Sequence, residues 1–280
     1  MIKLIASDLD GTILDSKHSI PDDNLKAIDN IQKAHIPFAI CTGKTYSISK
    51  EICEHLNANY GIFGNGSQII DLSTGKEIAR KVLTLDEIKS CFSVIEKYHL
   101  HVHAYTENGI VTTNLEYMDL RNSILFPNKI KCELVPSVFD YIVEQNITVF
   151  KLIVSSTYNL SKIKKEFEDS TNLTITHIHK TGIYKDKVID KEYEYLDISP
   201  LNVTKGKALE FLTQYLELNK DDILSIGDNV NDIDMFKASG IGAAVNNAYD
   251  EVKQVANYVT DNSAENAGFA EAIYKFVPFS

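Results

Sequence analysis

The sequence predicts an α/β protein with an open parallel-sheet core, interrupted by an inserted α+β segment. Short apolar runs alternate with stretches of helical spacing. Several of the runs end in acidic or hydroxyl residues and glycine, as strands do at the ligand-binding edge of such a sheet. From about residue 84 to 196 glycines become rare and the pattern changes to helix, strand, strand, which indicates a second domain inserted into the first.

The first apolar run, Ile2–Ala6, is too short for a free-standing helix and predicts a buried strand that leads into Asp8-Leu9-Asp10-Gly11. Side chains two residues apart in an extended chain point the same way, so Asp8 and Asp10 face one spot. Two converging carboxylates stay ionised when a hard cation lies between them, which suggests Mg²⁺. The alternative is an ordinary acidic turn. A calcium loop is excluded because Gly11 comes too early in the pattern.

A helical pattern from Leu25 to Ile31 leads to a second strand, residues 36–40, which ends in Cys41-Thr42-Gly43-Lys44. The Walker phosphate loop is excluded because Phe38 occupies the position of its first glycine. The Thr42 hydroxyl could hold a phosphate oxygen beside free N–H groups, or it could cap the next helix.

A third short strand ends in Gly64-Asn65-Gly66, where Asn65 could touch a ligand or supply turn chemistry. Beyond the inserted segment, Lys205 lies at the start of a helix. The strand 222–226 then ends in Gly227-Asp228-Asn229-Val230-Asn231-Asp232, so acidic groups again follow a strand.

In the inserted segment we expect a helix within Leu134–Asn146 and strands at Val149–Val154 and Leu173–Ile178. Histidine and tyrosine alternate along two of its strands, so each set faces one side of a sheet. A histidine metal site is possible there, but a half-exposed sheet face is the better interpretation. These residues are His101, His103 and Tyr105, with His177 and His179.

The 280 residues carry a formal net charge of −11, which disfavours DNA or RNA as a partner. No run is long enough to span a membrane and the N-terminus lacks a signal-peptide pattern, so we expect a cytoplasmic protein, a monomer or weak homo-oligomer. The four cysteines contain no C-x-x-C pair, which argues against a zinc cluster.

Together, several acids, a hydroxyl and a lysine, each placed at a strand or helix end, are what phosphoryl transfer needs. In this combination the chain resembles the haloacid dehalogenase-like hydrolases, specifically their Cof-type sugar-phosphatase branch with a C2-type cap. The resemblance covers essentially the whole chain. Its four motifs correspond to Asp8-Leu9-Asp10-Gly11-Thr12, Thr42-Gly43-Lys44, Lys205-Gly206 and Gly227-Asp228-Asn229-Val230-Asn231-Asp232.

The resemblance implies a Mg²⁺-dependent phosphatase that acts on a small phosphorylated metabolite. It makes Asp8 the nucleophile and a metal ligand, and Asp10 the general acid/base with its backbone carbonyl on the metal. The other roles are metal binding by Asp228, phosphate or substrate binding by Thr42, Gly43, Asn65 and Lys205, and orientation of the site by Asn231 and Asp232. Lys44 stands where the family usually has arginine.

The resemblance also implies a Rossmannoid core, residues 1–82 and 197–280, with a cap at 83–196. A phosphomutase of the same superfamily is the alternative enzyme, but it needs a second phosphate clamp, and the chain has only Arg80 and Arg121 as arginines. A phospho-accepting switch is the non-enzymatic alternative.

Overall fold

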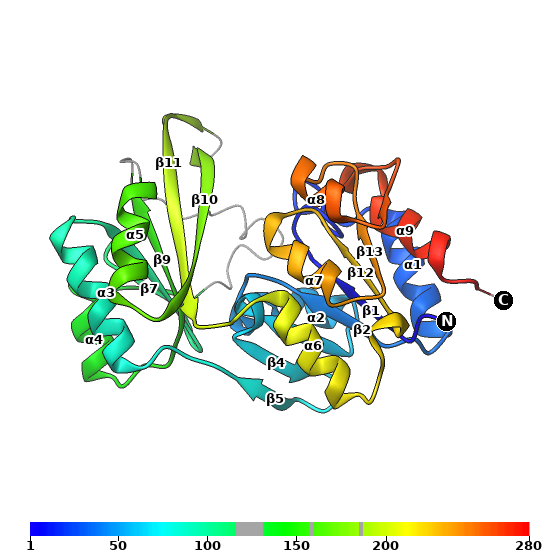
Figure 1. Cartoon of the computed structure of the whole chain (residues 1–280), viewed down its shortest axis with the longest axis horizontal. Helices are drawn as coiled ribbons and strands as arrows, with labels where there is room; N and C mark the ends of the chain where they lie inside the picture. The colour runs from blue at the N-terminus through cyan, green and yellow to red at the C-terminus, as the bar shows by residue number, and fades with distance from the viewer. Residues whose placement is uncertain (116–130, 157–159, 185–186, 280) are drawn as a thin grey trace. The chain divides into compact units, whose positions relative to one another are not determined.

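A computed structural model describes residues 1–115, 131–156, 160–184 and 187–279; the side chains of 177–184 and 187–193 are not described. The chain divides into two compact units (Figure 1). The core unit comprises Met1–Arg80 and Thr204–Ser280, so both ends of the chain build it, and the inserted unit is Lys81–Val203.

The core unit contains an eight-stranded sheet in the order β14-β13-β12-β1-β2-β3-β4-β5. Pairing is parallel from β14 to β3 and antiparallel from β3 to β5. The predicted α/β fold with a parallel-sheet core is confirmed. The strands are β1 (Leu4–Ser7), β2 (Phe38–Cys41), β3 (Tyr60–Phe63), β4 (Gln68–Asp71), β5 (Lys76–Arg80), β12 (Ile223–Gly227), β13 (Ile241–Ala244) and β14 (Tyr258–Val259).

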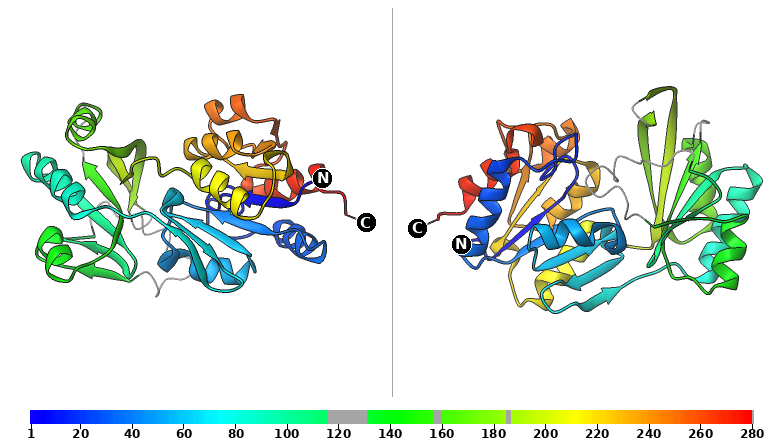
Figure 2. Two further views of the ribbon diagram at one scale, coloured as in Figure 1. Left: turned by 60° about the horizontal axis from the view of Figure 1, so that its bottom comes forward. Right: turned by 180° about the vertical axis from the view of Figure 1, so that it is seen from behind.

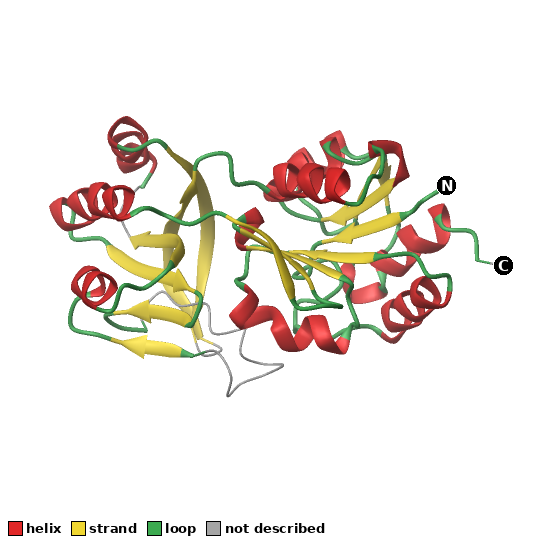
Figure 3. Cartoon of the chain, turned by 90° about the horizontal axis from the view of Figure 1, so that it is seen from below, coloured by secondary structure: helices red, strands yellow, loops and turns green. Residues whose placement is uncertain are grey.

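Helices cover both faces of this sheet, as Figure 3 shows. Leu4 and Ala6 of β1 share one buried cluster with α6, α7 and α8, whereas Phe38 of β2 packs on Phe269 of α9, with ring centroids 6.1 Å apart. Burial on both faces explains why the central strands are continuous apolar runs. The helices are α1 (Asp22–Lys33), α2 (Tyr46–His55), α6 (Lys205–Tyr215), α7 (Ile233–Lys237), α8 (Asp250–Val255) and α9 (Gly268–Phe276).

The inserted unit contains a six-stranded sheet in the order β10-β11-β9-β6-β7-β8, antiparallel except for the β7–β8 pair. Strands β10 and β11 form its longest hairpin (Figure 2). The strands are β6 (His101–Thr106), β7 (Gly109–Thr112), β8 (Cys132–Leu134), β9 (Val149–Ser156), β10 (Leu173–Tyr184) and β11 (Lys187–Pro200).

Three helices pack on one face of that sheet: α3 (Leu85–Lys97), α4 (Val138–Glu144) and α5 (Ser161–Ser170). Helix α3 begins with a capping box, in which the Thr84 hydroxyl accepts from the Glu87 N–H and the Glu87 carboxylate accepts from the Thr84 N–H. Within the described residues, no helix is both long and apolar enough to cross a membrane.

Candidate active site

The candidate site begins where three neighbouring parallel strands end. Strand β1 lies between β12 and β2, and Ser7 is level with Ile226 on one side and Ile40 on the other. The residues that follow these strands therefore emerge together at the carboxyl edge of the sheet. In this way the fold brings the loops that carry Asp8, Thr42 and Asp228 to one place.

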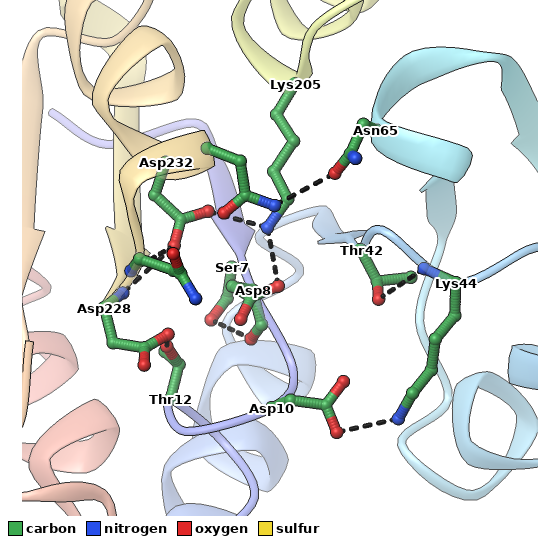
Figure 4. Close-up of polar contacts among 12 residues, drawn as sticks. Ser7, Asp8, Asp10, Thr12, Thr42, Lys44, Asn65, Lys205, Asp228 and Asp232 are labelled. Atoms are coloured by element: carbon green, nitrogen blue, oxygen red, sulfur yellow. Dashed lines mark hydrogen bonds and ion pairs between the residues drawn. The ribbon is translucent and has the colours of Figure 1, made fainter. Parts of the chain in front are cut away.

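Three carboxylates, from Asp8, Asp228 and Asp232, converge there (Figure 4). One oxygen from each lies within 4.8 Å of the others. The ammonium Nζ of Lys205 donates to Asp8 Oδ1 at 2.6 Å and to Asp232 Oδ1 at 2.7 Å. Only 1% of the Lys205 side chain is exposed, so its charge is available to these two carboxylates and not to bulk water.

Burial dominates the electrostatics of this cluster. It raises the pKa of Asp8 to about 7, against the attraction of Lys205 and with help from Asp232 and Asp10. It likewise raises the pKa of Asp228 to about 8, with the charges of Asp8 and Asp232 adding to the effect. Burial alone lowers the pKa of Lys205, but Asp232 and Asp8 outweigh it and hold that pKa above its usual range.

One lysine does not balance three carboxylates, and the donor set consists of carboxylate oxygens. Hard divalent cations bind oxygen ligands of this kind, so the residues present fit such a cation. Burial raises the pKa values of Asp8 and Asp228, and repulsion from the neighbouring carboxylates adds to the effect, so a cation bound beside them would favour their ionised forms.

Backbone geometry fixes the Asp228 side of the cluster. Asp232 ends a short 3₁₀ helix, Val230–Asp232, and its Oδ2 accepts from the N–H groups of Asp228 and Asn229, each at 3.0 Å. On the other side, Thr12 Oγ1 donates to Asp228 Oδ1 at 3.2 Å. Gly11 has a φ of +80°, and a Cβ there would lie 2.5 Å from Asp228 Oδ2, so only glycine fits.

Asp10 faces away from the three-carboxylate cluster and pairs with basic groups (Figure 4). Its Oδ1 accepts from Lys44 Nζ at 2.7 Å and lies 3.2 Å from His18 Nδ1. Burial raises the pKa of Asp10, but the charge of Lys44 and hydrogen bonds from His18 and Lys44 outweigh it and hold that pKa far below its usual range. Lys44, which stands where the family usually has arginine, thus contacts the Asp10 carboxylate.

The Thr42 hydroxyl accepts from the Lys44 N–H at 3.2 Å. Its alternative role as a helix cap is wrong, because α2 starts at Tyr46 and its N-cap residue is Thr45. Asn65 has a φ of +56°, and its Oδ1 accepts from Asn231 Nδ2 at 3.0 Å.

A Cβ on Gly43 would lie 3.1 Å from Asn65 Oδ1, so these two residues are close neighbours. The structure therefore gathers all the predicted site residues of the core unit into two groups. One group surrounds Lys205, and the other lies around Thr42, Asn65 and Lys44.

In the inserted unit, alternation places His101, His103 and Tyr105 on the sheet face opposite the helices. The side chains of His177 and His179 lie outside the described residues. The sequence interpretation missed a buried ion pair in this unit, in which Lys151 Nζ contacts Asp197 Oδ2 at 2.7 Å.

Lys151 also lies over the Tyr105 ring, 5.1 Å from its centroid. The signal that could have identified this pair is a lysine within an otherwise apolar strand, because such a charge requires a partner.

A family model described as haloacid dehalogenase-like hydrolase matches residues 5–273. The chain belongs to this family. A 5-amino-6-(5-phospho-D-ribitylamino)uracil phosphatase of Bacillus subtilis is 29% identical over 277 residues, which cover 99% of this chain and 96% of that one.

Solved structures of haloacid dehalogenase-like hydrolases share the fold. One from B. subtilis gives a TM-score of 0.82 at 23% identity, over 99% of this chain and all of that one. A subclass IIB sugar phosphatase gives 0.75 at 20% identity, over 98% of each chain. With the family and the phosphatases among its relatives in agreement, this haloacid dehalogenase-like hydrolase is a phosphoric monoester hydrolase for a small phosphorylated substrate.

Proposed function

We propose that the chain is a Mg²⁺-dependent phosphatase that hydrolyses sugar phosphates or similar small monoesters through an aspartyl phosphate on Asp8. The observation that carries the proposal is the convergence of Asp8, Asp228 and Asp232 on buried Lys205 at the end of β1. Mg²⁺ held by Asp8, Asp228 and the Asp10 carbonyl would offset the repulsion between substrate and carboxylates.

In the first step, a carboxylate oxygen of Asp8 attacks phosphorus, and the bond from phosphorus to the alcohol oxygen breaks. Lys205 and the Thr42 hydroxyl hold the phosphate oxygens, with Asn65 and Gly43 beside them. Asp10 gives its proton to the departing oxygen. Because the phosphate dianion adds negative charge beside Asp10, substrate binding raises the pKa of that carboxyl and favours the protonated acid.

In the second step, Asp10 takes a proton from water as the water oxygen attacks phosphorus, and the Asp8–phosphorus bond breaks to release inorganic phosphate. The contacts of Asp10 with Lys44 and His18 support this step, because they favour the ionised form that accepts a proton. Asn231 and Asp232 would keep the surrounding groups oriented.

We infer that the inserted segment is the cap, predicted at 83–196, and that the sheet face opposite α3, α4 and α5 selects the leaving group. The mutase alternative is disfavoured because the chain has only two arginines for a second phosphate clamp, and one of them, Arg80, contacts Glu77 at 2.9 Å. Arg121 lies outside the described residues. Four free cysteines support a cytoplasmic enzyme, and the net charge of −11 supports action on small molecules and not on nucleic acid. We propose that the enzyme is a monomer or weak homo-oligomer.

The test is a hydrolysis screen of the purified full chain with Mg²⁺ and with a chelator. The panel contains sugar phosphates, pyridoxal phosphate, flavin mononucleotide, nucleotides and the phosphoribitylaminouracil named for the B. subtilis relative. We expect phosphate release with Mg²⁺ only, and none from Asp8→Asn. Mass spectrometry of acid-quenched protein should find a short-lived phosphoryl group on Asp8. A phosphoryl group that persists without turnover would support the switch, and full hydrolysis by Asp8→Asn would exclude the covalent mechanism.

A further inference from the structure

The turn after Asp8 is closed by its own backbone. The N–H of Gly11 donates to the Leu14 carbonyl at 2.9 Å, and the N–H groups of Ile13 and Leu14 donate to the Leu9 carbonyl at 3.1 and 2.8 Å. These bonds shape the turn, and its distance from the rest of the site depends on contacts with other segments. At its start the Asp8 N–H donates to the Ile226 carbonyl at 3.0 Å, and further along Thr12 Oγ1 donates to Asp228 Oδ1. The Gly11 carbonyl between them needs a contact of its own.

Asn247 supplies such a contact. It lies in the loop between β13 and α8, and its Nδ2 donates to the Gly11 carbonyl at 2.7 Å. Its Oδ1 accepts from the N–H of Ala264, also at 2.7 Å. A single amide side chain thus joins the turn that follows Asp8 to the C-terminal part of the chain.

The same loop is hydrogen-bonded to the strand end that carries Asp228. The Val245 N–H donates to the Gly227 carbonyl at 3.1 Å, and the Tyr249 N–H donates to the Asp228 carbonyl at 3.1 Å. The loop therefore contacts both sides of the carboxylate cluster, through its backbone on one side and through Asn247 on the other.

The distance between the turn that follows Asp8 and the strand end that carries Asp228 can change very little. Gly11 approaches Asp228 so closely that an added Cβ would lie 2.5 Å from Asp228 Oδ2, and Thr12 Oγ1 contacts the other carboxylate oxygen at 3.2 Å. A shift of the turn would change the distances from Asp8 and the Asp10 carbonyl to Asp228. Those are the groups proposed to hold the cation.

We propose that Asn247 is a positioning residue, which sets the spacing between the Asp8–Thr12 turn and Asp228 and thereby the affinity for the divalent cation. The proposal rests on the phosphatase function for its effect on turnover, but its effect on cation binding can be measured separately. Loss of a hydrogen-bonded group that orients metal ligands commonly weakens metal affinity by roughly 10-fold or more.

Because Asn247 is exposed, its effect on Mg²⁺ binding can be distinguished from an effect on the stability of the fold. Asn247 is exposed, so water can satisfy the groups it leaves, and its loss should change the unfolding temperature little. Asn24 offers the contrast. It makes an analogous bridge, from the Ile13 carbonyl to the Ala270 N–H, but it is fully buried, so Asn24→Ala should destabilise the fold.

The experiment compares the full-length wild type with Asn247→Ala and with the matched control Asn246→Ala. Asn246 is the adjacent exposed asparagine, and its Nδ2 donates to the Asp261 carbonyl at 3.0 Å. Calorimetric titration of metal-free protein with Mg²⁺ alone gives the affinity, thermal unfolding checks the fold, and kcat and KM are measured with the best ester of the panel.

We expect Asn247→Ala to bind Mg²⁺ roughly 10-fold more weakly and to need a correspondingly higher Mg²⁺ concentration for half-maximal activity, with Asn246→Ala unchanged. Wild-type Mg²⁺ affinity in folded Asn247→Ala would overturn the proposal, whatever its kcat, and so would equal losses of affinity in both variants. If Asn247→Ala does not fold, Asn247→Ser is judged by the same criteria. If no ester is hydrolysed by the wild type, the proposed function fails, while the Mg²⁺ titration still decides the role of Asn247.

Discussion

Asp8→Asn should abolish hydrolysis and at the same time stabilise the metal-free protein at neutral and alkaline pH. The substitution removes one of three converging carboxylates and leaves Lys205 paired with Asp232 at 2.7 Å. The amide oxygen of asparagine can still accept from Lys205. The fold therefore loses repulsion and keeps most of its contacts.

The size of the stabilisation follows from the pKa of Asp8, which burial raises from 3.8 to about 7. This shift corresponds to on the order of 4 kcal/mol of unfolding free energy. In the wild type, the unfolded chain releases this proton near pH 3.8, whereas the folded chain keeps it up to about pH 7. Wild-type stability is thus lost as pH rises through that range. Asparagine does not titrate, so the advantage of the variant should grow over the same range and become constant above it.

Denaturant unfolding in a chelator, at about pH 5 and about pH 8, measures this difference. Asp169→Asn, an exposed change in the inserted unit, is the control for removal of one negative charge. Excess Mg²⁺ should stabilise the wild type more than Asp8→Asn, since only the wild type has the full set of carboxylates. A variant that is less stable than the wild type at the higher pH, or an advantage that does not change with pH, would refute the reasoning.

Three further results are expected. Asp10→Asn should slow hydrolysis of alkyl phosphates more than of activated aryl phosphates, because aryl leaving groups need little protonation; an equal loss would argue against that role. Gly11→Ala should cost about 1–3 kcal/mol in denaturant unfolding, because of its positive φ, and should weaken Mg²⁺ binding in calorimetry, because its Cβ meets Asp228. Alanine variants of His101, His103 and Tyr105, on the sheet face opposite α3, α4 and α5, should change relative kcat/KM among esters by roughly tenfold, about 1.4 kcal/mol, at constant Mg²⁺ affinity. An unchanged ranking in all three variants would remove these residues from substrate selection.

The strand-end residues could be predicted because the physics that places them is local. An apolar run that stops at an acid marks both the buried strand and its end, and parallel strands share one edge. This sufficed to bring Asp8, Thr42 and Asp228 together. Lys205 could be included because it lies at a helix start beside these strands, but its burial could not be predicted. A lysine at a helix start gives no sign that it will be fully buried between two carboxylates.

The contacts of Asp10 could not be predicted, because they depend on loop conformation. His18 reaches Asp10 from a residue with a φ of +58°, and Lys44 reaches it across 34 positions of sequence. Asn247 could not be predicted as a positioning residue for a similar reason, because two asparagines after a strand are typical of a turn. A hydrogen bond from the Asn247 side chain to the Gly11 carbonyl, 236 positions away, cannot be recognised from composition or periodicity.

The charge balance of the site connects its fold to its chemistry. Lys205 pairs with Asp8 and Asp232, and Lys44 pairs with Asp10. The fourth carboxylate, that of Asp228, accepts from the Thr12 hydroxyl, and a phosphate dianion would add further negative charge. Stability alone would favour fewer acids, because burial already raises the pKa values of Asp8 and Asp228. A divalent cation removes the conflict, since it lets the cluster stay ionised and accept an anionic substrate beside a carboxylate nucleophile. The excess of acid over lysine at this site is therefore the feature of the chain that most directly favours a bound divalent cation.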